Sequence, residues 1–386
     1  MIKLKSLKPI VRISTISHSQ KNLFQICFLI LIWLIAVSSR LFLNGNVYGL
    51  DFSVFQPDGV LYALRTYMFL QRDELISAVT IENWYFLHGA SGLHFEPSSI
   101  LPDVTPAWGL VEPRVLYPLL SAPFVALFGM YGLLVIPCLS LLVLVLCIFK
   151  IGSSQNQSNF SVVLCLVLLT SPTTLRWMIA NITDSLFVAL FALTCVILTQ
   201  KYSIKKTYLY LGLLIILTSL TRFATPIWLA LAISDFVSGN KRRAAYISFT
   251  SLIATIPTFL TQPSNSVLPR EGELTIIEKI YALPWSFVKI LFVEVAELAV
   301  LDRQLLIILT VALLVSILSP KDTLHQRFLL VLLATWAIGA LNGSIGVNFR
   351  YQLPVIPFAC HVLLNNWSML RNWFFGRIKN IEREKA

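Results

Sequence analysis

The sequence has little charge and few acidic residues. Only 13% of its 386 residues are charged, and 19 aspartates and glutamates stand against 30 lysines and arginines. Hydrophobic residues make up 56% of the chain, and the mean hydropathy is +0.76. Soluble domains have about 25% charged residues. The composition therefore excludes a soluble globular protein and predicts an all-α polytopic membrane protein.

Other absences narrow the class further. None of the six cysteines lies in a polar loop, which argues against a disulfide framework and favours buried apolar thiols. There is no evident internal repeat and no low-complexity tract. No small-residue cleavage signal follows the apolar run 22–43, so we expect an uncleaved first span. The net charge of +11 comes from short loops and termini, which indicates membrane lipids and no nucleic acid as partners.

About ten apolar runs are expected to form transmembrane helices. They lie near 22–43, 130–149, 160–175, 184–200, 207–221, 225–239, 244–262, 304–319, 327–343 and 351–370. With both termini in the cytoplasm, the basic loops fall on the cytoplasmic side, as the positive-inside rule requires. We expect an integral protein of a bacterial plasma membrane, with the endoplasmic reticulum as the alternative.

Two further apolar runs, Leu116–Phe128 and Ile280–Leu301, would reverse the later loops if they crossed the membrane. We expect both to be interfacial helices. The predicted organisation is a single integral-membrane domain over residues 1–386. Its parts are a basic cytoplasmic arm (1–21), an extracytoplasmic loop with juxtamembrane helices (44–129), a second outer loop with an interfacial helix (263–303) and a cytoplasmic tail (371–386).

The segment 44–113 is acidic and aromatic, and we expect it to be an ordered functional loop outside the membrane. It holds eight aspartates and glutamates and only two arginines, whereas the preceding arm has five basic residues and no acid. Within it, Gln56-Pro57-Asp58-Gly59 precedes Tyr62 at the start of a helical pattern. Asp58 is either a helix N-cap or a base, and partial desolvation is expected to raise the pKa of such a base. Asp51 and Glu112 are the rival bases.

Five arginines are predicted at the outer ends of spans, on the side where the positive-inside rule disfavours them. The planar guanidinium matches phosphate oxygens, so we expect one or two of these arginines to bind a lipid phosphate. The alternative is that they extend to the interface or pair with carboxylates such as Asp184. The five are Arg40, Arg114, Arg176, Arg222 and Arg350.

Two segments bring both an arginine and a tyrosine to this outer layer. The run 112–120 contains Arg114 and Tyr117, and the run 348–354 contains Arg350 and Tyr351. Ordinary interfacial anchoring is the alternative for these side chains. His88 and His94 near Glu96 form only a weak metal-like grouping. No cofactor is expected, and we expect the protein to act without a metal, with a need for a divalent metal as the alternative.

These motifs together resemble the GT-C superfamily of multi-span glycosyltransferases, in the branch of protein O-mannosyltransferases and lipid A aminoarabinose transferases. That branch has an arginine near the end of the first span, then an acidic motif and a tyrosine. In this chain Gly59 replaces the second acid of the usual pair, and Arg114 stands where a lysine is common. The matching segments are Arg40, 56–59 with Tyr62, 114–118, 181–185, 221–223, and Arg350-Tyr351 with Pro354.

The resemblance implies transfer of a sugar from a polyprenyl-phosphate donor to a hydroxyl of a lipid, glycan or protein acceptor outside the membrane. Asp58 would act as the base, with inversion at the sugar carbon. Arg114 and Arg350 would bind the donor phosphate, and Arg222 and Arg176 are the alternative phosphate ligands. Donor positioning would fall to Tyr62, Tyr117 and Tyr351. The alternatives are a polysaccharide polymerase or lipid-linked glycan ligase, a small-molecule transporter and a structural subunit.

Overall fold

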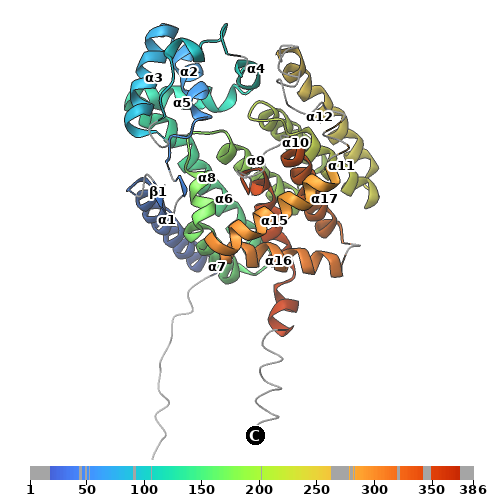
Figure 1. Ribbon diagram of the computed structural model, residues 1–386. Coiled ribbons are helices and arrows are strands. Elements are labelled where there is room, and N and C mark those ends of the chain that lie inside the picture. Colours follow the sequence, from blue (N-terminus) through green and yellow to red (C-terminus); the bar gives the residue numbers. More distant parts are fainter. Residues whose placement is uncertain are drawn as a thin grey trace, which may run out of the picture.

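The computed structural model of the chain is helical (Figure 1). It describes residues 18–42, 46–47, 50–51, 53–89, 93–105, 107–200, 202–261, 278, 281, 283–319, 322–341 and 349–373. Within this part, strand pairing is confined to β1 (Asn46–Val47) and β2 (Leu50–Asp51), which are antiparallel. The predicted all-α class is confirmed.

Along the chain, helices follow one another and are joined by short turns. The first part of the chain forms α1 (His18–Phe42), α2 (Gly59–Phe69), α3 (Glu74–His88), η2 (Pro97–Ile100), α4 (Trp108–Val111), α5 (Leu116–Phe128), η3 (Gly129–Leu134), α6 (Val135–Ser154), α7 (Ser158–Thr170) and α8 (Pro172–Met178). The second part forms α9 (Asp184–Thr199), α10 (Ile204–Ser219), α11 (Thr225–Val237), α12 (Lys241–Thr261), α15 (Leu283–Leu301), α16 (Arg303–Leu318), α17 (Thr323–Leu341), α18 (Phe349–Gln352), η4 (Leu353–Val355) and α19 (Ile356–Asn365).

Three helical stretches among the described residues are long and apolar enough to cross a membrane: Gln20–Phe42, Leu116–Ser154 and Thr323–Ala340. The number rises to five if each of two bent pairs is one span. These pairs are α7 with α8, bent by 71°, and Phe349–Asn365 with Trp367–Trp373, bent by 64°. Such apolar helices indicate a membrane protein, with fewer long spans than the ten expected.

Length and breaks explain the difference in count. The expected runs at 184–200, 225–239 and 304–319 form helices of 13 to 16 residues, shorter than the roughly 20 residues that a bilayer requires. The run at 160–175 breaks at Ser171, whose hydroxyl accepts a hydrogen bond from the backbone N–H of Thr174 at 3.0 Å and so begins α8. Hydropathy alone does not detect such a cap.

The two expected interfacial helices pack differently from each other. Leu116–Phe128 runs through η3 into α6 as a single 39-residue stretch, which at about 1.5 Å per residue is far longer than a bilayer core is thick. α15 packs against α16 and α17, and the indole N–H of Trp336 donates to Glu294 at 3.0 Å. Glu294 therefore faces the bundle, whereas Lys289 on the same helix is exposed.

The segment between α1 and α5 has a hydrophobic core of its own. Phe55, Leu64, Ile81 and Tyr85 are buried there together with Leu133 of η3. Figure 1 shows α2, α3 and α4 together at one end of the bundle. The predicted loop is therefore a folded helical unit that covers the end of the bundle where α9 begins.

Candidate functional site

A cavity of about 320 Å³ lies between the helical unit and the bundle. Its volume falls near the lower end of the range of small-molecule sites, about 300 to 1,000 Å³. The lining side chains come from α2, the segment before α5, the turn between α10 and α11, α17 and α18. They are Asp58, Leu61, Tyr62, Ala107, Val111, Arg114, Arg222, Phe223, Ile338, Arg350 and Tyr351.

Asp58 occupies the N-cap position of α2 but does not cap the helix. The turn before it is closed by the backbone, with the Gly59 N–H donating to the Gln56 carbonyl at 2.8 Å. The Asp58 carboxylate makes no capping hydrogen bond and instead forms an ion pair with Arg350. Its side chain is 57% exposed. The simple N-cap interpretation therefore does not account for this carboxylate.

Asn181 fixes the turn that carries Asp58. Its side-chain oxygen accepts from the Gln56 N–H at 2.9 Å, and its amide donates to the hydroxyl of Tyr85. A Cβ atom at Gly59 would lie 2.2 Å from the Asn181 amide nitrogen. A glutamate at position 59, the second acid of the pair usual in the GT-C branch, would therefore clash with Asn181.

Asp184 holds two of the cavity's arginines in place. It lies in the first turn of α9 and is 1% exposed. The Arg350 Nε donates to its carboxylate at 3.0 Å, and Arg222 forms an ion pair with the same group. A buried carboxylate needs such partners, so Asp184 fixes both guanidinium groups at the cavity wall.

Tyrosines contact two of the cavity's three arginines, Arg114 and Arg222. Arg114 Nη1 donates to the Tyr62 hydroxyl at 2.9 Å, and the Arg222 guanidinium lies 4.7 Å from the centre of the Tyr351 ring. Tyr117 does not line the cavity. It packs edge to face on Tyr62 at 5.7 Å, and its hydroxyl donates to the Leu133 carbonyl at 2.8 Å. Tyr117 therefore supports Tyr62 from behind.

The neighbouring arginines keep the Asp58 carboxyl group ionised by lowering its pKa. Burial by itself raises the pKa of this carboxyl, but the guanidinium groups of Arg350, Arg222 and Arg114 lower it by more, so that its pKa lies below the ordinary value of 3.8. The raised pKa expected from the sequence is therefore wrong. Burial, together with the neighbouring charges of Arg350 and Arg114, lowers the pKa of the Arg222 guanidinium. Like charges held this close favour a bound anion.

Several predicted residues lie elsewhere. Glu112 is not among the cavity-lining residues and interacts electrostatically with Arg65. Arg176 lies 3.8 Å from Glu297 of α15. Arg40 is buried at the end of α1 and does not line the cavity. Asp51 lies in β2, and its side chain falls outside the described part of the structure.

The linking roles of Asn181 and Asp184 do not follow from the sequence. Both residues lie in the segment 181–185, and the sequence predicts for Asp184 only a pairing with arginines. The available signal was an acid in the first turn of an apolar helix. Within the described residues, no group of three or more His, Cys, Asp or Glu side chains is arranged to hold a metal ion. His94 instead contacts Glu82.

No family model, curated protein or solved structure matches the chain. Function therefore has to follow from the chemistry of this cavity. An ionised, partly exposed carboxylate lies beside three guanidinium groups that two carboxylates only partly neutralise. Such an arrangement can bind a phosphate and accept a proton next to it.

Proposed function

We propose that this protein is a membrane glycosyltransferase of the GT-C type. It moves a sugar from a polyprenyl-phosphate donor to an acceptor hydroxyl on a lipid, glycan or protein, without a metal. Asp58 acts as the base, and Arg114, Arg222 and Arg350 bind the donor phosphate. Tyr62 and Tyr351 position the donor from the cavity wall, with Tyr117 behind Tyr62.

One observation carries the proposal. Three arginines from segments more than a hundred residues apart line the same cavity as Asp58. Lysine would supply the same charge, but arginine also offers parallel N–H donors that match a phosphate. Among the described residues that line the cavity, Asp58 is the one carboxylate, which makes it the candidate base.

The charges fit this reaction at each stage. Three guanidinium groups and the carboxylates of Asp58 and Asp184 leave one positive charge. A polyprenyl-phosphate sugar is a phosphodiester with one negative charge, which balances the site. After transfer, the released phosphate monoester carries a second negative charge while Asp58 has gained a proton. The site therefore stays neutral throughout, which keeps the electrostatic cost of the reaction low.

The bond changes are those of a single displacement. Asp58 takes the proton of the acceptor hydroxyl, and the oxygen attacks the anomeric carbon. The bond from that carbon to the phosphate oxygen breaks, and its electron pair leaves with the phosphate. Attack opposite the leaving group inverts the configuration. The arginines stabilise the leaving phosphate, so no general acid is required.

The resting ion pair between Asp58 and Arg350 has a role in this scheme. A bound phosphate competes for Arg350 and draws it away from Asp58. The carboxylate then loses its strongest positive neighbour and gains a negative one, so its pKa rises and it becomes a better base. Donor binding thus activates the base before the acceptor reacts.

The topology that accompanies this function has ten spans with both termini in the cytoplasm of a bacterial plasma membrane. Five further helices, α9, α10, α11, α12 and α16, complete the count. Support comes from α9, whose two ends lie next to polar, charged cavities while its middle is apolar. At about 1.5 Å per residue its 16 residues span about 24 Å, and the neighbouring turns extend it toward full bilayer thickness.

The test is transfer of radiolabelled sugar by the purified protein from a panel of polyprenyl-phosphate monosaccharides, with native membrane extract as the source of acceptors. We expect one donor to be used, with inverted anomeric configuration in the product. Retention of configuration would contradict the single-base mechanism. Turnover of lipid-linked oligosaccharides with none of any monosaccharide would replace the proposal with a polymerase or ligase.

A further inference from the structure

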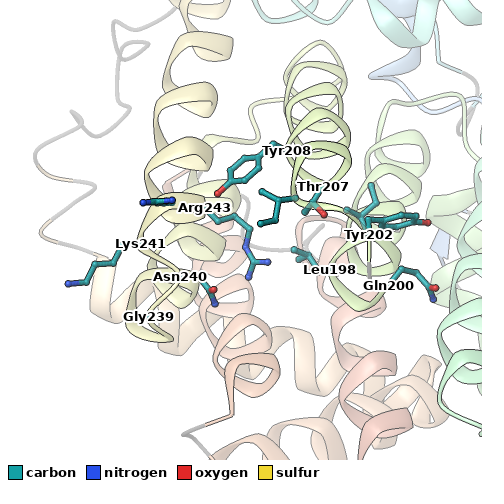
Figure 2. Close-up of a pocket in the computed structure, with 12 residues that line it drawn as sticks. Leu198, Gln200, Tyr202, Thr207, Tyr208, Gly239, Asn240, Lys241 and Arg243 are labelled. Atoms are coloured by element: carbon teal, nitrogen blue, oxygen red, sulfur yellow. The ribbon is translucent and has the colours of Figure 1, made fainter.

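Two adjoining cavities lie at the end of the bundle opposite Asp58. Their volumes are about 620 and 700 Å³, and they share Leu198, Gln200 and Asn240. Figure 2 shows the first, with Gln200 and Tyr202 on one side and Asn240 and Lys241 on the other. Because Asp184 begins α9 and Gln200 follows its last residue, about 24 Å separate this end from the proposed transfer site.

These cavities are basic. Their lining includes Lys241, Arg242, Arg243 and Arg327, and Asp322 is the one acidic side chain among the described lining residues. One oxygen of the Asp322 carboxylate accepts a hydrogen bond from the Leu324 N–H at 2.8 Å. Three of the basic residues occupy the first turn of α12, which contains no acid. Positive charge at a helix N-terminus is unfavourable, so an anion bound there would stabilise this turn.

Behind the basic rim lies a buried charged cluster. Asp235 is shared by Arg243, which donates to it at 2.8 Å, and by Arg327, which donates to it at 2.7 Å. Two guanidinium groups on one carboxylate leave one positive charge. Arg327 is 8% exposed, so this charge is held close to the cavity by buried structure and not by a mobile surface side chain.

Polar atoms at the cavity wall also lack partners. The Nε atom of Arg327, the amide nitrogen of Gln200 and the amide oxygen of Gln155 are buried and have no hydrogen-bond partner among the described residues. All three side chains line the second cavity. Two of these atoms are donors, as required for binding an anionic oxygen.

An apolar face begins at the same cavities. Leu209, Leu213 and Ile216 of α10 are 67%, 53% and 48% exposed. Their spacing places them on one face of the helix. On α10, the residues that line the first cavity are Ile204, Thr207 and Tyr208. The apolar face begins next to them and continues along the helix away from the cavity. The combination of a basic pocket and an apolar helical face matches an amphiphile with an anionic head.

We propose that this end of the bundle binds an anionic phospholipid. The phosphate of the headgroup lies in the basic cavities near Lys241, Arg242 and Arg327, and an acyl chain lies along the exposed face of α10. This lipid is separate from the sugar donor, and its binding does not depend on glycosyl transfer.

The experiment is a binding titration of the purified full-length protein in detergent by native mass spectrometry, with phosphatidylglycerol and with phosphatidylcholine. We expect phosphatidylglycerol to bind at least about tenfold more tightly, since each basic residue near an anionic headgroup favours binding. The double variant Lys241→Ala/Arg242→Ala should lose this preference. Both side chains are exposed, and an unchanged melting temperature verifies that the variant is folded.

The matched control is Lys205→Ala/Lys206→Ala, which removes the same charge from exposed positions at the same end, outside the cavity lining. It should keep the preference for phosphatidylglycerol. An equal loss in both double variants, or equal binding of the two lipids by the wild type, would overturn the proposal. Displacement of phosphatidylglycerol by inorganic phosphate would also overturn it, because the site would then recognise free phosphate alone.

Discussion

The two ends of the bundle carry the same charged unit, a buried aspartate shared by two arginines. At one end Asp184 holds Arg222 and Arg350, and at the other Asp235 holds Arg243 and Arg327. Both aspartates are 1% exposed. Among the described residues, only the first end has an arginine that also pairs with an exposed carboxylate, that of Asp58.

This difference distinguishes the requirements for binding an anion from those for catalysing a reaction. A buried aspartate with two arginines positions positive charge at a cavity wall, and that is sufficient to bind an anion at either end. Proton transfer also needs a carboxylate that an acceptor can reach next to the bound anion. At the first end Asp58 pairs directly with Arg350, whereas at the other end the exposed Asp322 accepts from the Leu324 N–H. The predictions below test this division, from the largest expected effect to the smallest.

Apart from replacement of the base itself, replacing Arg350 with alanine should have the largest effect on transfer. Arg350 contacts both Asp58 and Asp184, and loss of one preorganised charge at a developing anion lowers kcat by about 10²- to 10³-fold. Initial rates of sugar transfer measure this. Arg72→Ala, on the helical unit that carries Asp58 but outside the cavity lining, is the control and should transfer at the wild-type rate. Equal rates for the two variants would remove Arg350 from the phosphate site.

Asp184→Ala and Asp235→Ala compare the two ends directly. Each leaves two arginines without their buried counter-charge, so each should destabilise the protein by about 3 to 5 kcal/mol. Thermal unfolding measures that loss. Transfer per folded molecule should fall only in Asp184→Ala, because only Asp184 positions arginines beside Asp58. A similar fall in Asp235→Ala would show that the two ends are not functionally separate.

Gly59→Ala tests how rigidly Asp58 is held. The added Cβ would meet the side chain of Asn181, which is fully buried and already bonded to Gln56. We expect a loss of about 1 to 3 kcal/mol in unfolding free energy from this overpacking, together with reduced transfer. Gly339→Ala is the control, because its Cβ would have no neighbour nearer than 3.9 Å. It should unfold at the wild-type temperature or slightly above.

The pH dependence should differ between free and donor-bound enzyme. The free enzyme has the pKa of Asp58 lowered by its arginines, so the acid limb of kcat/KM should lie below pH 3.8. The ion pair with Arg350 likewise stabilises the fold above the unfolded pKa, about 3.9, and this contribution disappears as pH falls through the folded value. In the donor complex the phosphate competes for Arg350, so the acid limb of kcat should lie at higher pH. Coincident limbs would contradict competition for Arg350.

Part of the site could be anticipated from the sequence. Asp58, Arg114, Arg222 and Arg350 were expected in one outer layer because short polar motifs interrupt apolar runs at corresponding ends. The structure brings all four to one cavity. Arg176 came from the same pattern yet contacts Glu297, because a pattern of span ends gives depth and not direction around the bundle.

Other features depend on contacts that no local pattern reports. Asp235 and Arg327 are 92 residues apart, and both look like ordinary residues near loops. At the bend after α7, Asp302 contacts the Ser171 hydroxyl and accepts a hydrogen bond from the Thr173 N–H at 3.2 Å, across 129 residues of sequence. The lowered pKa of Asp58 results from three distant arginines, whereas its sequence neighbours suggested only desolvation.

The most direct test compares Asp58→Asn with Asp73→Asn in the sugar-transfer assay. Both aspartates stand at helix N-termini in the same unit, but Asp73 caps its helix by accepting from the Ile76 N–H at 2.9 Å, and asparagine retains that ability. Loss of a general base predicts a rate about 10²- to 10⁴-fold lower for Asp58→Asn, with unchanged folding and a normal rate for Asp73→Asn. Wild-type transfer by Asp58→Asn would contradict the assignment of Asp58 as the base.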